Sequence, residues 1–589
     1  MKKDAIIILF VIAVLLGLYS INKINLGYSI PDEKRYIQST KEMEASGDYI
    51  TPRYHGNLRF QKPILFYWLI IFSYKIFGVT IFGARFPSIL AAVLNVIITY
   101  LLTRTLFNKK AALFSGLTLA TCEVFFMYAG FAVTDMTFIL FIALAIYSFI
   151  KAYLGDIKSK FRYLYMYVFM ALAVLTKGPL GFFYPALTIA AFIVIRKDWA
   201  VMKEVKLILG MSIFIAISAP WFITMIILHG NEYLNNVWSL EIIKKLNISR
   251  SGESPAFGGP IHYFSSVFYY FGMIFLRHLP WSVFLPAAIF SLPHRAVSFH
   301  KKEKCGLHLM LAWFFVVFIT IAAIWSRESY YILPLSVPLA IFIGKYLADL
   351  TEENNLYRSA LFIIPFVLII ILSAVTFAAW MCISFYVFDR PIFSLSLLMW
   401  LLPMGMLAAY LLQATPAAIG GGGAPLVGRK ILLPISMCAT AIACFAYFAG
   451  GVLPLLNNDP LSHFADEIRQ VIKEGDLIAT ESESVSYHRL NVYLDTYSVI
   501  GIRKDSLNEF LSNKDKRVFC LVSAKHYEEF VAENLKKRLH ILDKAPDWKR
   551  LDKQNRQYFE NLVSYILQNK RGAVKEALKE KVYLVSNKE

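Results

Sequence analysis

Long apolar segments, separated by short polar ones, occupy the first three quarters of the chain. A helix needs roughly 20 mostly apolar residues to cross a membrane, and the pattern predicts about thirteen such spans. They lie near residues 5–21, 86–105, 111–129, 133–150, 162–177, 180–195, 206–228, 268–290, 307–325, 330–347, 359–387, 393–412 and 430–453. We therefore predict an all-α, polytopic membrane domain over residues 1–453.

The pattern changes after Pro454. The segment "FADEIRQVIKEGDLIAT" has the period of a helix followed by a strand, and "LNEFLSNKDKRVFCLVS" repeats that alternation. This predicts a soluble α/β domain over residues 454–589. It carries 23 Lys/Arg and 21 Asp/Glu, so almost all of the chain's net charge of +19 belongs to the membrane part.

Basic loops recur after every second predicted span, among them "NKK" after 86–105 and "RKDWAVMKEVK" after 180–195. Cytoplasmic loops of membrane proteins are rich in Lys and Arg, so these loops and the N-terminus are expected in the cytoplasm. An odd number of spans then places the C-terminal domain outside. The first apolar segment lacks a small-residue cleavage site and is interpreted as an uncleaved helix.

The composition supports a membrane protein. Hydrophobic residues make up 57% of the chain and charged residues 17%, against the usual 45–50% apolar residues of soluble domains. In a soluble protein the positive charge would suggest nucleic acid; here membrane topology explains it, and no nucleic-acid partner is expected. The six cysteines form no CxxC pattern, and no disulfide framework is expected.

Two exterior loops are predicted, at residues 22–85 and 230–267. The first contains nine Lys/Arg, which is unusual for an outer loop. Within it, "YIQSTKEMEAS" predicts a helix ending at Gly47, and "KPILFYWLIIFSYKIFG" is short for a span and fits an interfacial helix. The basic excess has two explanations, namely contact with lipid headgroups or a binding site for an anionic lipid substrate.

Several charged and polar residues fall at the predicted outer face. Each could be a helix-end side chain that reaches to water, but together they suggest chemistry, because a carboxylate can act as a base and cations stabilise a departing phosphate. Sugar transfer from a polyprenyl phosphate needs both. The predicted catalytic residues are Asp32, Glu33 and Asp135, and the predicted substrate- or phosphate-binding residues are Arg59, Lys62, Lys177, Lys245, Arg327 and Tyr331.

The segment from "PDEKRY" through "GDYITP", "QKPILFYW" and "ARFPS", followed by "TDM", "LTKGP" and "YILP", resembles bacterial aminoarabinose transferases that modify lipid A. More broadly it is similar to the protein mannosyltransferase-like GT-C glycosyltransferases. The resemblance covers about residues 1–350, and the rest in layout. It implies that Asp32 is the base or acceptor-orienting group, that Lys62 contacts the lipid phosphate, that Asp135 and Lys177 are polar cavity residues, and that Arg327 and Tyr331 lie near the phosphate site. Glu33 is expected either to take part directly or to hold a neighbouring cation and shape the loop, and Lys34 and Arg35 to contact headgroups.

Two departures from the family pattern concern a metal. The family often has Glu before the lysine and a histidine partner, whereas this chain has Gln61 and Ile242 at those positions. An amide and an isoleucine make a poor divalent site, so no bound metal is predicted.

The preferred function is therefore an integral-membrane GT-C glycosyltransferase of the inner membrane. It would move a sugar from a polyprenyl-phosphate donor to a lipid, such as a lipid A-like molecule, or to a protein at the outer face. A protein O-mannosyltransferase-like enzyme is the alternative within this class. A lipid or sugar transporter is the alternative outside it, which the absence of a sequence repeat disfavours. In the C-terminal domain, Glu481, Glu483 and His488 are interpreted as a solvated face.

Overall fold

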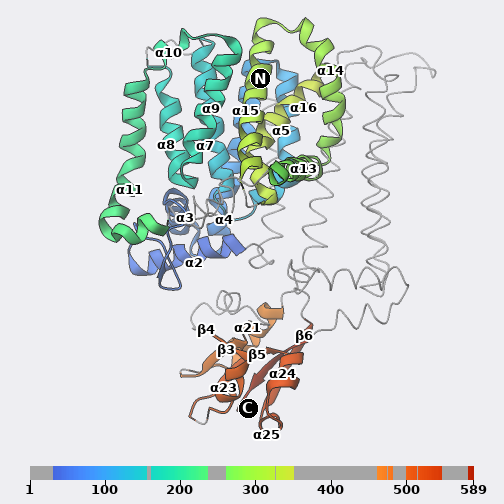
Figure 1. The fold of residues 1–589 in the computed structure, drawn as a ribbon. Coiled ribbons are helices and arrows are strands. Elements are labelled where there is room, and N and C mark those ends of the chain that lie inside the picture. Colours follow the sequence, from blue (N-terminus) through green and yellow to red (C-terminus); the bar gives the residue numbers. More distant parts are fainter. Residues whose placement is uncertain are drawn as a thin grey trace, which may run out of the picture. The chain divides into compact units, whose positions relative to one another are not determined.

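A computed structural model describes residues 31–155, 161–236, 260–324, 327–350, 460–473, 475–481, 499–513, 515–546 and 581–588. The described residues form two compact units. The first ends at Leu350 and is helical; the second begins at Pro460 and contains a β-sheet (Figure 1). Each is described by itself.

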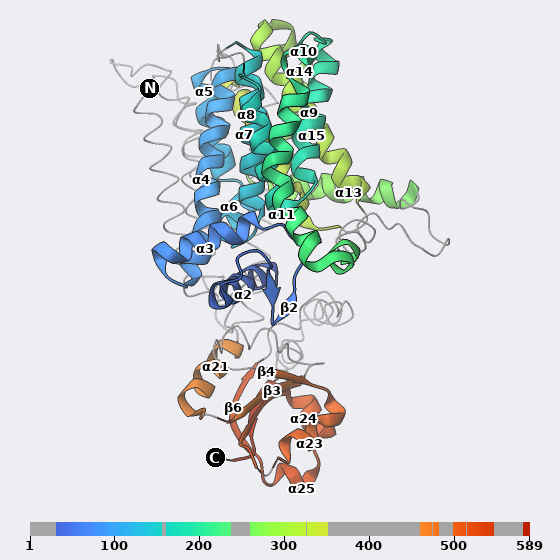
Figure 2. The ribbon, with the colours of Figure 1, turned by 90° about the vertical axis from the view of Figure 1, so that its left-hand side faces the viewer.

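The first unit begins with short elements on one end of the helical bundle (Figure 2). Helix α2 (Pro31–Ser46) ends where Gly47 adopts a φ of +70°, as the sequence predicted. Strands β1 (Arg53–Tyr54) and β2 (Asn57–Leu58) form a hairpin whose two turn residues have φ values of +52° and +76°. Such a turn matches the twist of a hairpin. Helix α3 (Leu65–Phe77) has 13 residues, or about 20 Å, which agrees with the predicted short helix.

Five helical segments of this unit are long and apolar enough to cross a membrane. They are α4 (Ile81–Leu106), α7 (Asp135–Tyr153), α11 (Leu207–Asn236), α15 (Lys301–Ala323) and the continuous pair η3 (Ser329–Leu335) and α16 (Ser336–Leu350). Helices α8 (Leu164–Lys177) and α9 (Leu180–Arg196) are apolar but shorter, and α10 (Val201–Glu204) is a single turn.

Two predicted spans are bent pairs, and the count rises to seven if each pair is one span. Helices α5 (Lys109–Ala120) and α6 (Glu123–Ala129) meet at 63°. Helix α13 (Pro260–Arg277) meets the segment formed by η2 (Trp281–Phe284) and α14 (Leu285–Ser298) at 112°. The span predicted over 268–290 is bent in the structure, and the break lies next to Pro280, which has no N–H to continue a helix. The predicted spans 5–21, 359–387, 393–412 and 430–453 lie outside the described residues, so the total of thirteen stays a prediction.

Helices α16 and α5 pack closely against each other within the bundle. Helix α16 lies against α5 at Gly344, where a Cβ atom would come within 2.3 Å of the Ser115 hydroxyl. Small residues at such contacts let membrane helices approach closely. The two helices lie side by side in Figure 1.

The second unit is a five-stranded mixed sheet with the strand order β4-β3-β5-β7-β6. Strand β3 (Leu477–Glu481) pairs in parallel with β4 (Val499–Ile502) and β5 (Val518–Ser523). Strand β7 (Lys581–Ser586) lies antiparallel between β5 and β6 (His540–Pro546). Helices α21 (Pro460–Val471), α23 (Leu507–Leu511), α24 (Ala524–Phe530) and α25 (Glu533–Lys536), with the short turn η6 (Lys504–Ser506), complete it. The predicted helix and strand alternation is confirmed, while 454 as the boundary stays a prediction.

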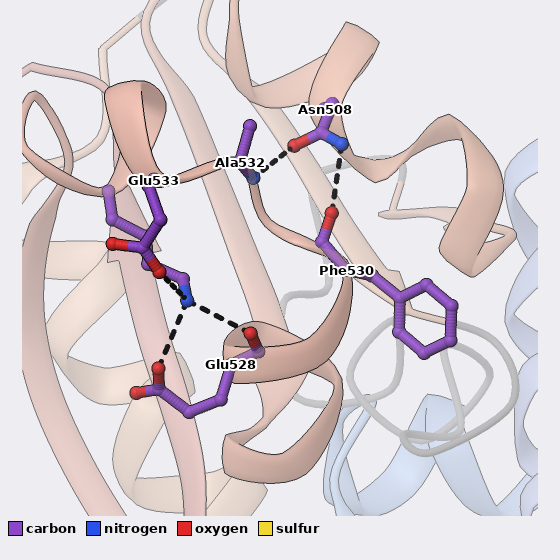
Figure 3. Close-up of polar contacts among 6 residues, drawn as sticks. Asn508, Glu528, Phe530, Ala532 and Glu533 are labelled. Atoms are coloured by element: carbon purple, nitrogen blue, oxygen red, sulfur yellow. Dashed lines mark hydrogen bonds and ion pairs between the residues drawn. The ribbon is translucent and has the colours of Figure 1, made fainter.

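Polar contacts hold the three short helices α23, α24 and α25 of this unit together (Figure 3). The Asn508 amide donates to the Phe530 carbonyl at 2.8 Å and accepts from the Ala532 N–H at 2.9 Å. The Lys536 ammonium donates to the carboxylates of Glu528 and Glu533 at 3.1 and 2.8 Å. The contacts satisfy backbone groups of the loop between α24 and α25, so we interpret these residues as structural.

Candidate active site

A cavity of about 560 Å³ lies in the first unit, within the range of about 300–1,000 Å³ typical of ligand sites. Its walls come from the first turn of α2, the hairpin, the start of α7, the junction of α8 and α9, the end of α15, and η3. Its polar lining is Asp32, Arg35, Tyr36, Tyr54, Asn57, Arg59, Gln61, Lys62, Thr134, Asp135, Lys177, Tyr184, Tyr330 and Tyr331. Its apolar lining is Leu58, Val133, Phe138, Leu180, Ile321, Ile324 and Pro334.

Six of the nine predicted site residues line this one cavity. They are Asp32, Arg59, Lys62, Asp135, Lys177 and Tyr331. Because they come from five separate elements, their meeting is a consequence of the fold. Of the other three, Glu33 and Arg327 lie outside the lining, and Lys245 lies outside the described residues.

Asp32 is the accessible carboxylate of the cavity. It lies in the first turn of α2, where the helix dipole favours a negative charge. Its side chain is 42% exposed and pairs with Arg35 at 2.9 Å, one turn further along the helix. The carboxylate therefore stays open to the cavity and able to accept a further hydrogen bond.

Asp135 and Lys177 form an enclosed ion pair. The Lys177 ammonium lies 2.5 Å from Asp135 Oδ1, and the two side chains are 14% and 8% exposed. The ammonium also lies 5.3 Å from the Phe138 ring centre and 5.6 Å from that of Tyr330, positions suited to cation–π attraction. Since Asp135 already binds a cation, its geometry suits positioning of Lys177 better than proton transfer.

Arg59 is held by two tyrosines. Its Nε donates to the Tyr67 hydroxyl at 2.9 Å, and its guanidinium carbon lies 5.5 Å from the Tyr36 ring centre. Burial, with the neighbouring Tyr67, raises the pKa of Tyr36 well above its ordinary value. The tyrosine thus remains a neutral hydroxyl beside the cation, and the guanidinium is held rigidly at the cavity wall.

Glu33 does not line the cavity. Its carboxylate is fully buried and accepts hydrogen bonds from Arg85 Nε at 2.7 Å, from Arg85 Nη2 at 2.9 Å and from the Ala132 N–H at 2.9 Å. A catalytic role for Glu33 stays a prediction, which this geometry does not favour, because the carboxylate is enclosed by these donors and does not line the cavity. The other expectation, that it holds a neighbouring cation, agrees with this geometry.

Arg327 also lies outside the cavity lining. Its guanidinium donates to the hydroxyls of Ser266 at 3.0 Å and Ser265 at 2.5 Å, both on α13. The role predicted for Arg327 in binding substrate or phosphate stays a prediction, whereas Tyr331, four residues later, does line the cavity.

Gln61 lines the cavity, and its Oε1 atom is buried without a hydrogen-bond partner among the described residues. Within the described part of the chain, no three His, Cys, Asp or Glu side chains come close enough to hold a metal ion. Ile242, the second altered position, lies outside the described residues. Gln61 itself offers only an amide oxygen to a divalent ion, and the absence of a metal stays a prediction.

Several residues that line the cavity were not predicted from the sequence as site residues. Arg35 is the most informative of them. It was interpreted as a headgroup contact, but it faces the cavity and pairs with Asp32. Helical residues three apart share one face, and this spacing could have revealed the pair. The lining residues Tyr54, Asn57, Tyr184 and Tyr330 carry no comparable signal in the sequence.

Comparison with known proteins supports the resemblance. Residues 61–223 match a family model described as dolichyl-phosphate-mannose-protein mannosyltransferase. The crystal structure of ArnT from Cupriavidus metallidurans in the apo state superposes with a TM-score of 0.70, at 18% identity, over 99% of this chain and 98% of that one. The chain shares the fold of this ArnT. The structure of the same ArnT bound to undecaprenyl phosphate gives a TM-score of 0.69 at 19% identity, over 98% and 97% of the two chains.

Sequence comparison finds the same kind of relative. An undecaprenyl phosphate-alpha-4-amino-4-deoxy-L-arabinose arabinosyl transferase of Edwardsiella ictaluri is 28% identical over 331 residues, 55% of this chain and 56% of that protein. An uncharacterised protein of Aquifex aeolicus is 30% identical over 340 residues, 56% of this chain and 63% of that protein. The matched region thus spans less than two thirds of each relative. The predicted resemblance to ArnT-like GT-C proteins is confirmed.

Proposed function

We propose that this protein is an integral-membrane glycosyltransferase that moves a sugar from a polyprenyl-phosphate donor to a lipid acceptor. One observation carries the proposal: a single cavity joins an accessible carboxylate, four cations and an apolar flank. The apolar helices and the ArnT-like fold support a multi-pass protein of the inner membrane. We place the N-terminus in the cytoplasm and the domain of residues 454–589 outside, on the loop charges.

The cations suit the donor phosphate. When the bond between the sugar C1 and the phosphate oxygen breaks, its electron pair stays on the phosphate, which leaves as an anion. Fixed charges aimed at that oxygen stabilise the transition state because they need no reorganisation. These charges come from Arg59, Lys62 and Lys177, which line the cavity. Arg59 is held in place by its two tyrosine neighbours, and Lys177 is held by its ion pair with Asp135.

Asp32 suits the acceptor. An incoming hydroxyl attacks C1 and loses its proton, which the Asp32 carboxylate accepts. If the acceptor is a phosphate that is already ionised, no proton needs to be taken and Asp32 orients the attacking oxygen. The pairing of Asp32 with Arg35 keeps the carboxylate in place in either case.

The apolar flank suits a prenyl chain. Ile321, Ile324 and Leu180 lie on the cavity wall beside the charged residues, so a ligand with an anionic head and a hydrocarbon tail fits the lining. The relatives' names, which contain undecaprenyl phosphate and arabinosyl transferase, support this class of donor. A lipid A-like acceptor is our first expectation from the resemblance of the sequence motifs, with a protein acceptor as the alternative.

The test is turnover of an undecaprenyl-phosphate sugar by the purified full chain in detergent, measured as release of undecaprenyl phosphate. Paired reactions contain a lipid A-like acceptor or an acceptor peptide, and the product is identified by mass. Sugar on the lipid supports the proposal, and sugar on the peptide alone moves the protein to the mannosyltransferase-like class. No turnover with any donor, together with lipid flux in vesicles, would refute an enzyme and favour a transporter.

A further inference from the structure

A buried ion pair joins the helix that carries Asp32 to the helical bundle. Glu33 of α2 and Arg85 of α4 have side chains that are 0% and 4% exposed. The guanidinium donates to both carboxylate oxygens, at 2.7 and 2.9 Å. Because Glu33 directly follows Asp32, this contact fixes the turn of α2 on which Asp32 lies. A two-point contact between planar groups restricts orientation as well as distance.

The same carboxylate also contacts the segment that leads into α7. Glu33 Oε1 accepts a hydrogen bond from the Ala132 N–H at 2.9 Å, and the next three residues, 133–135, line the cavity. Helix α4 supports this segment again through Ser88, whose hydroxyl donates to the Val133 carbonyl at 3.1 Å. A single carboxylate therefore connects the walls that carry Asp32 and Asp135.

A third contact completes the attachment of that wall to α4. The Asn95 amide donates to the Met136 carbonyl at 2.9 Å and to the Ala91 carbonyl of its own helix at the same distance. Ser88 and Asn95 hold only the segment that leads into α7. Among the contacts described here, the Glu33–Arg85 pair alone also holds α2.

We propose that Glu33 and Arg85 are positioning residues for sugar transfer, which set the separation between Asp32 and the Asp135–Lys177 pair across the cavity. This inference rests on the proposed function, and neither side chain touches the substrate. The competing explanation is that the pair serves folding alone. A buried ion pair is weak evidence of stabilisation by itself, but it is well suited to fix one element against another.

The kinetic test uses Glu33→Gln, Arg85→Met and the double variant. Displacing a reacting group by about 1 Å costs roughly 100-fold in rate, so we expect kcat to fall roughly 100-fold in each single variant. The donor KM should change little, since the cations that bind phosphate remain. The two residues act as one unit, so the losses in the double variant should not multiply. Arg85→Lys keeps the charge and one hydrogen bond, and should restore part of kcat.

The matched control is Glu303→Gln. It breaks an ion pair of similar length between α15 and α16, where the Lys345 ammonium lies 2.7 Å from Glu303. Neither residue lines the main cavity. Its kcat should equal that of the wild type even where its thermal midpoint falls. A loss of kcat in proportion to the loss of folded protein, in this control and in the Glu33 and Arg85 variants alike, would show that all these pairs serve folding alone.

Amide hydrogen exchange tests the positioning without any substrate. In Glu33→Gln, Arg85→Met and Arg85→Lys, amides of residues 130–136 and of α2 should exchange faster than in the wild type, while in Glu303→Gln they should not. If the wild type turns over no donor, the proposed function fails, and exchange still decides whether the pair holds the two walls. Unchanged exchange in all three variants, or a wild-type kcat in the single variants, would overturn the inference.

Discussion

The enclosed Asp135–Lys177 pair makes a quantitative prediction. In Lys177→Met the ammonium 2.5 Å from Asp135 is lost, and an aspartate only 8% exposed is left without that partner. Removing one member of a buried ion pair costs about 3–5 kcal/mol. The remaining exposure of both groups puts the expected loss at the lower end, about 3 kcal/mol. The thermal midpoint of unfolding in detergent should therefore fall clearly.

The double variant Lys177→Met, Asp135→Asn separates stability from binding. It removes both charges, so most of the lost stability should return. Donor turnover should not return, because a hydrogen bond to a charged group contributes about 1.5–3 kcal/mol, which corresponds to roughly 10- to 150-fold in kcat/KM. Both variants are compared with Lys109→Met, which removes an exposed cation at the start of α5.

Two results would refute this reasoning. A Lys177→Met protein as stable as the wild type would show that the aspartate is not enclosed as described. A double variant with wild-type kcat/KM for the undecaprenyl-phosphate sugar would show that Lys177 does not act on the donor phosphate.

Three further predictions concern other parts of the first unit. Asp32→Asn should lower kcat by roughly 10²–10⁴ with a hydroxyl acceptor and much less with an ionised phosphate acceptor. The control is Asp48→Asn, which lies outside the cavity. Equal activity of the Asp32 variant on both acceptors would refute the role of Asp32 as a base. Glu42→Ala removes the acceptor of the hairpin-turn N–H groups of residues 55 and 56, which lie 2.7 and 3.1 Å from its carboxylate. Because each hydrogen bond to a charged group is worth about 1.5 kcal/mol or more, KM should rise about tenfold at nearly constant kcat. Steady-state kinetics measures both constants, and an unchanged KM would count against this role of Glu42. Gly344→Ala should lower the thermal midpoint of unfolding because its Cβ would lie 2.3 Å from a hydroxyl of α5, whereas Gly272→Ala, whose Cβ would meet no atom within 4 Å, should not. Equal midpoints of the two variants would contradict the close packing of α16 against α5.

The site residues were predicted because each lies either near a change from apolar to polar sequence or in the exterior loop predicted at 22–85. Six of them line one cavity, where the fold brings helix ends and this loop together. The helix ending at Gly47 and the short helix before α4 were also predicted, from local signals alone. In contrast, the bend between α13 and α14 follows from a proline within a mostly apolar segment. The hydropathy pattern does not show that this proline changes the direction of the helix axis.

The different surroundings of Asp32 and Glu33 could not be predicted from the sequence. Both are carboxylates in the first turn of one helix, and nothing in their types distinguishes them. Successive helical residues point about 100° apart, so one faces the cavity and the other faces α4. The choice depends on Arg85, 52 residues away, which encloses Glu33. The surroundings of Arg327 also depend on a distant segment, because two serines on α13 bind it.

Sequence alone predicted apolar helices of spanning length in the first part, the change to an α/β unit after it, and six of the residues that line the candidate site. These features depend on hydropathy, local helix signals and loop charge, all of which act over short stretches of chain. Only the tertiary structure decided which charges are paired and which are open. Burial and pairing depend on contacts between distant segments, and in "SIPDEKRY" they leave Asp32 accessible, enclose Glu33 and turn Arg35 toward the cavity.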